Sequence, residues 1–330
     1  MPKPPSLEDQ LARVRILRDR PIADISDAEL LGLLSSKHSI IAAKAAEMAG
    51  TGKRAALIPD LLAAFDRFME NPEKNDRGCA AKFAVINALC ALDYRDPTLY
   101  RRGMNHVQKE ASFGPQTDTA AEMRGRCAIA LAECGADLAV LEIVEVLVDP
   151  EPQARIGAAR AISAFGSEEA AAILRLKLLT GDDEPIVLAE CCLALLHLSM
   201  EQHADFVATF LASADDAVAI DFATSLTESR DPGVLSIMRT IYAQARSSTV
   251  RKAVLAALAL LRVDGAIEFI LERIAADLHA QAKEALDSLK PRRADERLRA
   301  RIEAVLEKRG DAVLQRHYNA AFGEASPPSR

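Results

Sequence analysis

Residues 151–178 read EPQARIGAARAISAFGSEEAAAILRLKL, and this stretch decides the fold. Its first half places Ile156, Ala159 and Ile162 three residues apart, on one face of an α-helix. Gly166 then supplies a stop signal, because glycine is the usual residue just past a helix end. Apolar side chains resume after it at helical spacing. The stretch therefore predicts two short helices joined by a turn.

The same element recurs along the chain, in the stretches IALAECG, RAISAFG, LALLHLS, TSLTESR and AALALLR. Its equivalent positions, separated by 31, 33, 31 and 32 residues, are Leu131, Ile162, Leu195, Leu226 and Leu258. Leu89 and Ala46 extend the series backwards at separations of 42 and 43, and Leu286 adds a copy at 28. The sequence predicts about eight helix pairs, two of them longer and near the N-terminus.

The composition fits a stack of such pairs. Of the 330 residues, 50% are hydrophobic but only 4% are aromatic, and the chain has no Trp. Alanine makes up the difference, and its small side chain lets helices approach closely. One pair cannot bury its apolar stripe alone, so neighbouring pairs must stack. We therefore expect an all-α fold, an α-solenoid wound as a right-handed superhelix whose second helices line a concave face. Nothing in the sequence alternates as strands do.

Two stretches resemble HEAT repeats of the short bacterial kind, the PBS-lyase HEAT-like repeats: residues 151–178 and STVRKAVLAALALLRVDGAIEFILERI. The family signature is a turn acid or Pro, then Val-Arg, two small residues, Ala-Leu and a Gly. The matching residues are Pro152, Arg155, Ala158, Ala159, Ile162 and Gly166 in the first stretch, and Val250, Arg251, Ala253, Ala257 and Leu258 in the second. The units at Leu195 and Leu226 lack the basic residue. The resemblance covers about residues 27–290 and implies the fold. Members of the HEAT-like family serve as scaffolds, adaptors, enzyme accessories and, in one branch, chromophore lyases.

The organisation follows from these repeats. We expect an N-terminal capping helix over 1–26 and a HEAT-like array over 27–290 with an irregular insertion at 93–125. A C-terminal capping helix over 291–310 and a flexible tail over 311–330 complete it. Within the insertion we expect one helix near 98–109 and then a loop into a helix start. Capping-box spacing marks two such starts, at Ser26 with Glu29 and at Thr119 with Glu122.

The net charge and the positions of the cysteines limit the classes of function that the protein can have. The net charge of -7 is carried by an acidic body between mildly basic ends, which disfavours nucleic acid as a partner. A HEAT-like DNA glycosylase is disfavoured for the same reason and because Trp is absent. No apolar run is long enough for a membrane span or a signal peptide, so we expect a cytoplasmic protein. The six cysteines lie in helical stretches without metal-ligand spacing and predict buried free thiols, with no metal and no cofactor.

The insertion holds the candidate partner-binding residues, because it concentrates aromatic, basic and amide groups that are scarce elsewhere. They are Tyr94, Tyr100, Arg101, Arg102, His106, Gln108, Lys109 and Phe113. Aromatic and Arg side chains of this kind anchor partners in interaction hot spots. The alternative is that the segment is a decorated repeat whose Tyr and Phe fill the joint between two irregular units.

The leading functional prediction is a non-catalytic scaffold or adaptor that binds another protein, as a helix or peptide, on the concave surface. The alternative is an enzyme or enzyme subunit with its site in the irregular unit, lyase-like or nucleic-acid-modifying. Nucleophile elbows, P-loops, dinucleotide fingerprints and zinc-protease motifs are absent. Convergence of Tyr100, Arg102, His106 and Glu110 in one pocket would favour the enzyme.

Overall fold

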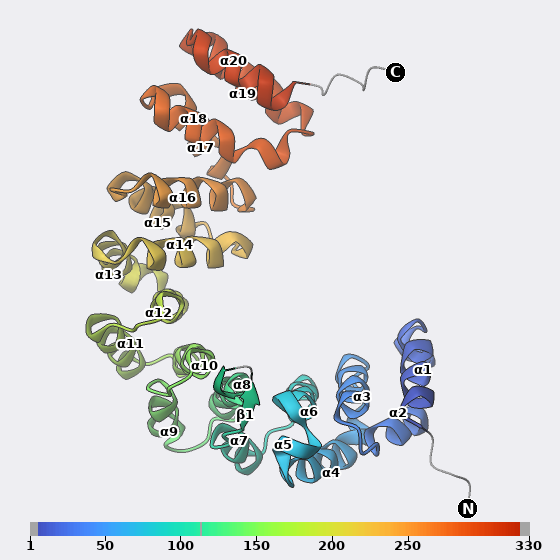
Figure 1. Cartoon of the computed structure of the whole chain (residues 1–330). Coiled ribbons are helices and arrows are strands. Elements are labelled where there is room, and N and C mark those ends of the chain that lie inside the picture. Colours follow the sequence, from blue (N-terminus) through green and yellow to red (C-terminus); the bar gives the residue numbers. More distant parts are fainter. Residues whose placement is uncertain (1–5, 113, 324–330) are drawn as a thin grey trace, which may run out of the picture. The chain divides into compact units, whose positions relative to one another are not determined.

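The computed structural model describes residues 6–112 and 114–323, and their secondary structure is almost entirely helical. The chain divides into two compact units, Met1–Leu174 and Arg175–Arg330. Helix α11 (Glu168–Thr180) spans the boundary between them. Each unit consists of helices in two layers, here called layer A and layer B (Figure 1). The predicted all-α solenoid class of fold is confirmed.

In unit 1, neighbouring layer A helices pack against one another along the chain. Layer A consists of α1 (Leu7–Arg18), α3 (Ser39–Thr51), α6 (Ala80–Ala91), α8 (Ala121–Glu133) and α10 (Pro152–Ser163). Layer B consists of α2 (Asp27–Leu34), α4 (Ile58–Met69), α7 (Pro97–Met104) and α9 (Ala139–Val146). The short helix α5 (Pro72–Asn75) and a 3₁₀ turn at Arg77–Cys79 connect α4 to α6. This connection accounts for the first of the two longer repeats.

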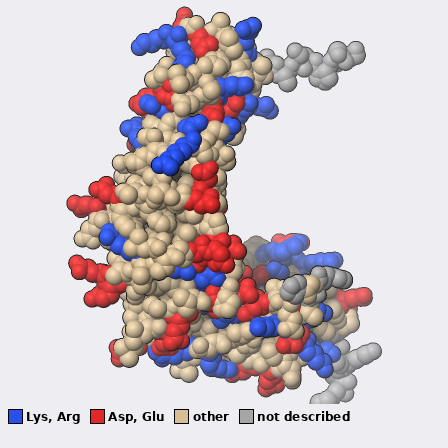
Figure 2. Space-filling model, turned by 60° about the vertical axis from the view of Figure 1, so that its left-hand side comes forward, with Lys and Arg blue, Asp and Glu red and all other residues tan. Residues whose placement is uncertain are grey.

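Unit 2 repeats the arrangement. Its layer A consists of α12 (Pro185–Leu198), α14 (Asp216–Ser225), α16 (Ser248–Leu260), α18 (His279–Ser288) and α20 (Ala312–Phe322). Its layer B consists of α13 (Met200–Ser213), α15 (Gly233–Gln244), α17 (Ala266–Ala276) and α19 (Glu296–Arg309). Short 3₁₀ turns occur in both units, at Ile22–Asp24 and Ala55–Leu57 in unit 1 and at Leu226–Glu228 and Lys290–Arg292 in unit 2. Basic side chains lie among acidic ones over α17–α20, at the top of Figure 2.

The repeat register is confirmed by burial. All eight residues predicted to be equivalent are at most 5% exposed: Ala46, Leu89, Leu131, Ile162, Leu195, Leu226, Leu258 and Leu286. Each lies on a layer A helix or, for Leu226, in the turn that directly follows one. Pairing each layer A helix from α3 to α18 with the next α-helix along the chain, which for α10 is the boundary helix α11, gives the eight predicted pairs. The apolar period therefore marks the side of each layer A helix that faces the core.

Small residues set the closest helix approaches. Helices α8 and α10 cross at Gly125 and Gly157, where a Cβ on Gly157 would overlap the backbone of Gly125. A Cβ on Gly125 would lie 2.8 Å from the carbonyl oxygen of Gln153. Helices α3 and α6 meet in a similar way, since a Cβ on Gly50 would lie 2.9 Å from Ala88 Cα. This close packing is the structural reason for the high alanine content.

The insertion at 93–125 differs from its prediction. The helix α7 ends at Met104 instead of near 109, and an antiparallel hairpin follows, formed by β1 (Lys109–Ser112) and β2 (Gly114–Asp118). Thr119 does not cap α8: its hydroxyl donates to Glu110 and to the Gln108 carbonyl. The capping box at Ser26 and Glu29 is present as predicted.

The C-terminal region also needs correction. The segment expected as a capping helix over 291–310 contains α19, which pairs with α18, and residues 312–322 of the expected flexible tail form the helix α20 (Ala312–Phe322). Its Leu314, Tyr318 and Phe322 are buried, and the rings of Tyr318 and Phe322 stack 5.0 Å apart. This apolar face packs against α18 and α19 and so extends layer A by one helix.

Candidate functional surfaces

The predicted patch is not one surface. Tyr100 and Gln108 are each 1% exposed, so neither can contact a docked partner, and these two assignments were wrong. The Tyr100 hydroxyl donates to the Tyr94 carbonyl at 2.6 Å, and burial raises the pKa of Tyr100. Tyr94 is half-buried, and its hydroxyl donates to Asp96. For these aromatic residues the alternative reading, a packing joint between irregular units, fits the structure.

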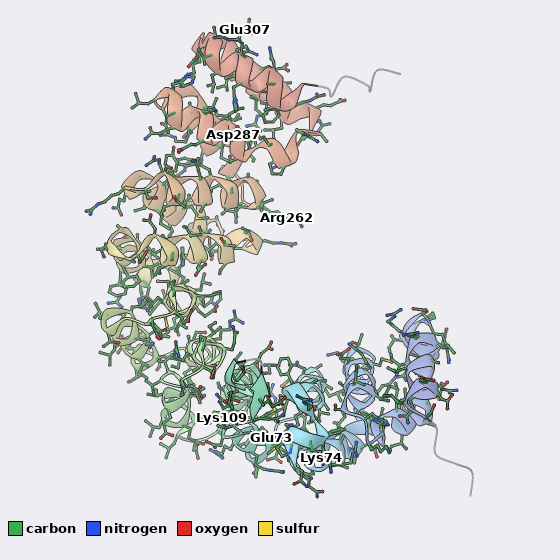
Figure 3. All side chains as sticks on the ribbon, viewed as in Figure 1. Glu73, Lys74, Lys109, Arg262, Asp287 and Glu307 are labelled. Atoms are coloured by element: carbon green, nitrogen blue, oxygen red, sulfur yellow. The ribbon has the colours of Figure 1, made fainter. Side chains whose placement is uncertain are left out.

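The two arginines of the patch belong to different ion pairs. Arg101 makes a bidentate pair with Glu142 on α9, with contacts of 2.8–3.0 Å. Arg102 pairs with Asp66 on α4 at 2.8 Å and lies over the Phe65 ring. Together they tie α7 to its two neighbours in layer B. Lys109 is exposed on β1 (Figure 3), and Phe113 lies outside the described residues.

The groups considered for acid–base chemistry do not converge. His106 Nε2 lies 3.3 Å from Gln108 Oε1, and burial lowers the pKa of His106. Glu110 instead accepts hydrogen bonds from the Gly78 amide, Gln108 and Thr119. With Tyr100 buried and Arg102 paired to α4, these groups form no common pocket among the described residues. The convergence of these four side chains in one pocket, which would have favoured an enzyme, is therefore not seen among the described residues.

Beneath the hairpin lies a buried polar network that sequence reasoning missed. Lys82 and Asp76 form a fully buried ion pair at 2.8 Å. Asp76 also accepts from the amides of Ala81 and Lys82, and its carbonyl accepts from Gln108 Nε2 at 2.8 Å. The network thus joins the connection before α6 to the start of the hairpin. Every charge in it has a partner, which makes it a structural element.

A second buried cluster follows at α8. Arg124 binds both oxygens of Asp149 at 2.8 Å and donates to Asp118 and to the His106 carbonyl. Burial alone would raise the pKa of Asp118. Hydrogen bonds from the amides of Gln108 and Ala120 and from Arg124 outweigh this and hold its pKa below the usual range. The cluster fixes the hairpin to the next repeat.

Three buried basic residues and the half-buried Arg251 occupy one repeat position. Lys82, Arg124, Arg155 and Arg251 each lie seven residues before their register residue. Arg155 donates to the carbonyls of Asp149 and Pro150, and Arg251 donates to that of Ala245. The signal was available in the sequence, because the motif quoted for the resemblance already contained Arg155 and Arg251. These side chains stabilise inter-helix turns and are not available to a ligand.

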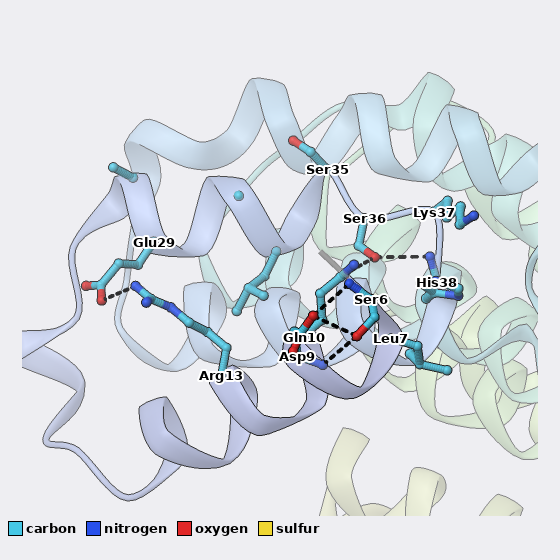
Figure 4. A pocket seen from close by; sticks show the side chains of 13 residues that line it. Ser6, Leu7, Asp9, Gln10, Arg13, Glu29, Ser35, Ser36, Lys37 and His38 are labelled. Atoms are coloured by element: carbon cyan, nitrogen blue, oxygen red, sulfur yellow. Dashed lines mark hydrogen bonds and ion pairs between the residues drawn. The ribbon is translucent and has the colours of Figure 1, made fainter. Parts of the chain in front are cut away.

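A pocket of about 1020 Å³ lies between α1 and α2 (Figure 4). It contains Ser, Asp and His side chains, but they form no catalytic arrangement. Ser6 and Asp9 cap α1 reciprocally, and Ser36 accepts from the backbone amide of His38, not from its ring. Arg13 pairs with Glu29 at 2.8 Å across the pocket. The Arg13–Glu29 pair thus ties α1 to α2, and Ser6 and Asp9 stabilise the start of α1.

A smaller groove of about 460 Å³ runs between α3 and α6 on layer A. Its floor consists of small residues, with Gly50 packed against Ala88. Ile40 and Phe83 add larger apolar side chains to its lining, and Ile40 is 54% exposed. At the rim Lys44 and Glu47 pair with each other at 2.8 Å, so neither charge is unbalanced in the groove. The result is an open apolar trough.

We next consider metal sites, reactive thiols and membrane-spanning helices in the described part of the chain. No group of three or more His, Cys, Asp or Glu side chains is placed there to hold a metal ion. All six cysteines are free thiols, and burial raises the pKa of Cys79 and of Cys191 to about 12, which makes them poor nucleophiles. None of the helices in residues 6–112 and 114–323 combines the length and apolar character needed to cross a membrane.

Stacked helix pairs with a recurring buried register define an α-solenoid repeat protein. Sequence comparison agrees: residues 116–196, from β2 into α12, match the family model described as HEAT repeats. No curated protein matches the sequence. Among solved structures, the crystal structure of an engineered protein is 16% identical, with a TM-score of 0.34, covering 96% of this chain and 91% of that one. The HEAT-type prediction is confirmed over 116–196; the PBS-lyase subtype is not reached by the match.

Proposed function

We propose that this protein is a non-catalytic interaction scaffold that holds a helix or peptide of another protein in the α3–α6 groove. The observation that supports it is the groove itself, an exposed apolar trough whose rim charges already pair with each other. Water-exposed apolar surface of this kind is typical of an interaction site.

The groove sets the size and chemistry of the partner segment. Along α3 it runs from Ile40 to Thr51, which is roughly 16 Å at the helical rise. About three turns of a partner helix fit this length. Its alanine floor admits close approach of small and medium apolar side chains, as in helix-in-groove recognition.

Three finer assignments belong to the same proposal. We assign the repeats to the PBS-lyase HEAT-like type on the pattern of Arg155, Ala159 and Gly166. We place the protein in the cytoplasm, since six free thiols suit a reducing compartment. Arg101, Arg102 and Lys109, the exposed or half-exposed basic residues of the predicted patch, stay candidates for a peripheral contact.

The test is a charge placed in the groove. Ile40→Glu introduces an unpaired carboxylate where the partner's apolar side chains would lie. Ile16→Glu is the matched control, because Ile16 is 62% exposed on α1 and lies outside the groove. Proteins that co-purify from the native host are identified by cross-linking mass spectrometry. We expect the partner to be lost from Ile40→Glu and retained by Ile16→Glu. A partner retained by both variants, with cross-links confined to layer B, would contradict the proposal.

A further inference from the structure

The outward face of α9 carries an aliphatic stripe that the proposed function does not use. Leu138, Leu141 and Val148 are 71%, 61% and 72% exposed. Leu141 and the half-exposed Val144 lie three residues apart on α9, whereas Leu138 is its N-cap residue and Val148 lies in the turn that follows it. The opposite face, with Ala139, Ile143 and Val146, is buried in the core. Helix α9 is thus apolar on two sides, although only one faces the interior.

Leu138 occupies a conformation that a leucine adopts at a cost. It is the residue that begins α9, with φ of 59° and ψ of 10° in the left-handed region. Glycine or asparagine would adopt this conformation more easily and would expose less apolar surface. The leucine side chain is favourable here if another molecule covers it.

The sequence segment that contains the stripe is acidic. From residue 133 to residue 151 the sequence has six acidic residues and no Lys or Arg. Glu142 is neutralised by Arg101, and Asp149 by Arg124. No ion pair is recorded in the described part of the chain for the exposed Glu133, Asp137 and Glu145. Arg95 lies beside Glu133, where it donates to the backbone carbonyl at 2.7 Å, so Asp137 and Glu145 supply the unpaired negative charge next to the stripe.

The stripe is also held in place. The bidentate Arg101–Glu142 pair joins α9 to α7, and α9 packs against α8 and α10. A rigid apolar strip needs less ordering when a partner docks than a loop would. It lies on layer B, whereas the α3–α6 groove lies on layer A.

We propose that the α9 stripe docks a partner protein through an amphipathic helix whose apolar face is flanked by Lys and Arg. Aliphatic side chains of the partner cover Leu138, Leu141 and Val148, and its basic side chains face Asp137 and Glu145. This goes beyond the proposed function, because it gives unit 1 a second binding surface on its other layer, with a different chemistry.

The test uses a synthetic probe and the full chain. The probe is a fluorescent helical peptide with leucines at i, i+3, i+7 and i+10 and lysines beside them. A second peptide carries glutamates in place of the lysines. Fluorescence polarisation measures both dissociation constants. We expect the lysine peptide to bind at least about tenfold more tightly than the glutamate peptide, and its dissociation constant to rise with salt.

The variant Leu141→Ser/Val148→Ser should weaken binding of the lysine peptide by about tenfold or more. Leu260→Ser is the control in unit 2, where the side chain is 57% exposed, and should leave it unchanged. Since all three residues are exposed, circular dichroism should show folded protein throughout. Ile40→Glu should also leave binding of the lysine peptide unchanged, because this peptide is expected to bind the α9 stripe and not the α3–α6 groove. Absent binding, equal binding of both peptides, or binding insensitive to the stripe variant would each overturn the proposal.

Discussion

At the residue scale, glycine and alanine decide how closely the layer A helices of unit 1 approach. Where Gly125 meets Gly157, the two backbones are in contact and no Cβ fits between them. A stack built on such contacts gains dispersion energy along the whole crossing. It is correspondingly sensitive to one added methyl group.

Gly157→Ala should therefore destabilise the protein by about 2 kcal/mol or more, because α8 and α10 must separate to admit the methyl group. Gly32→Ala is the matched control. Gly32 lies within α2 with open space at its Cβ, so alanine there should be neutral or stabilise by up to about 1 kcal/mol. Urea unfolding of both variants measures the difference. Equal stability of the two would show that the crossing is not as close as described.

The buried ion pair of Lys82 and Asp76 is a second residue-scale feature. Lys82→Met leaves the Asp76 carboxylate buried without its cation and should cost about 3–5 kcal/mol. Lys44→Met breaks an exposed pair with Glu47 and should cost less than about 1 kcal/mol. Chemical denaturation compares the two. A small effect at Lys82 would mean that water reaches the network.

At the scale of elements, sequence and structure agree where burial is periodic. Leu131, Ile162 and Leu258 repeat at nearly constant spacing, and each is buried. The hairpin was not predictable, because its strands, KEAS and GPQTD, consist mostly of polar residues, Pro and Gly, and Thr117 is their only β-branched residue. It is held in place by hydrogen bonds of Gln108 with Asp76, of Glu110 with Gly78 and of Asp118 with Arg124.

The candidate site shows the same limit. Scarce aromatic residues were read as a surface hot spot, but Tyr100 is buried because the Tyr94 carbonyl can satisfy its hydroxyl. The sequence did not predict the exposed stripe on α9, for a related reason. A helix with apolar residues on two sides looks like core in the sequence, and only the packed structure shows which side is left uncovered.

Helix α20 offers an element-scale prediction. Leu314 is fully buried in it, whereas its neighbour Val313 is exposed. Leu314→Ala should cost about 2–5 kcal/mol in local stability, and Val313→Ala should change stability little. Hydrogen exchange measures this directly, as lost protection in α18 to α20. Unchanged protection in the Leu314 variant would contradict the packed helix and would support the flexible tail that the sequence predicted for this segment.

At the scale of the whole molecule, contacts join helices that are near neighbours along the chain. Stability in such an array is a sum over pairs and their interfaces, so damage in α20 should leave the protection of unit 1 unchanged. The same modularity leaves the surface of each pair available for binding. It explains how two apolar surfaces of different chemistry can lie on opposite layers of one unit.

The central claim is that the α3–α6 groove binds another protein. It is tested most directly by a photo-crosslinking amino acid placed at Ala80, an exposed residue lining the groove, in the native host. The same amino acid at the exposed Leu260 in unit 2 is the control. The account predicts a discrete protein adduct at Ala80 that is absent at Leu260 and disappears with Ile40→Glu. The absence of an adduct at Ala80, or identical adducts at both positions, would contradict it.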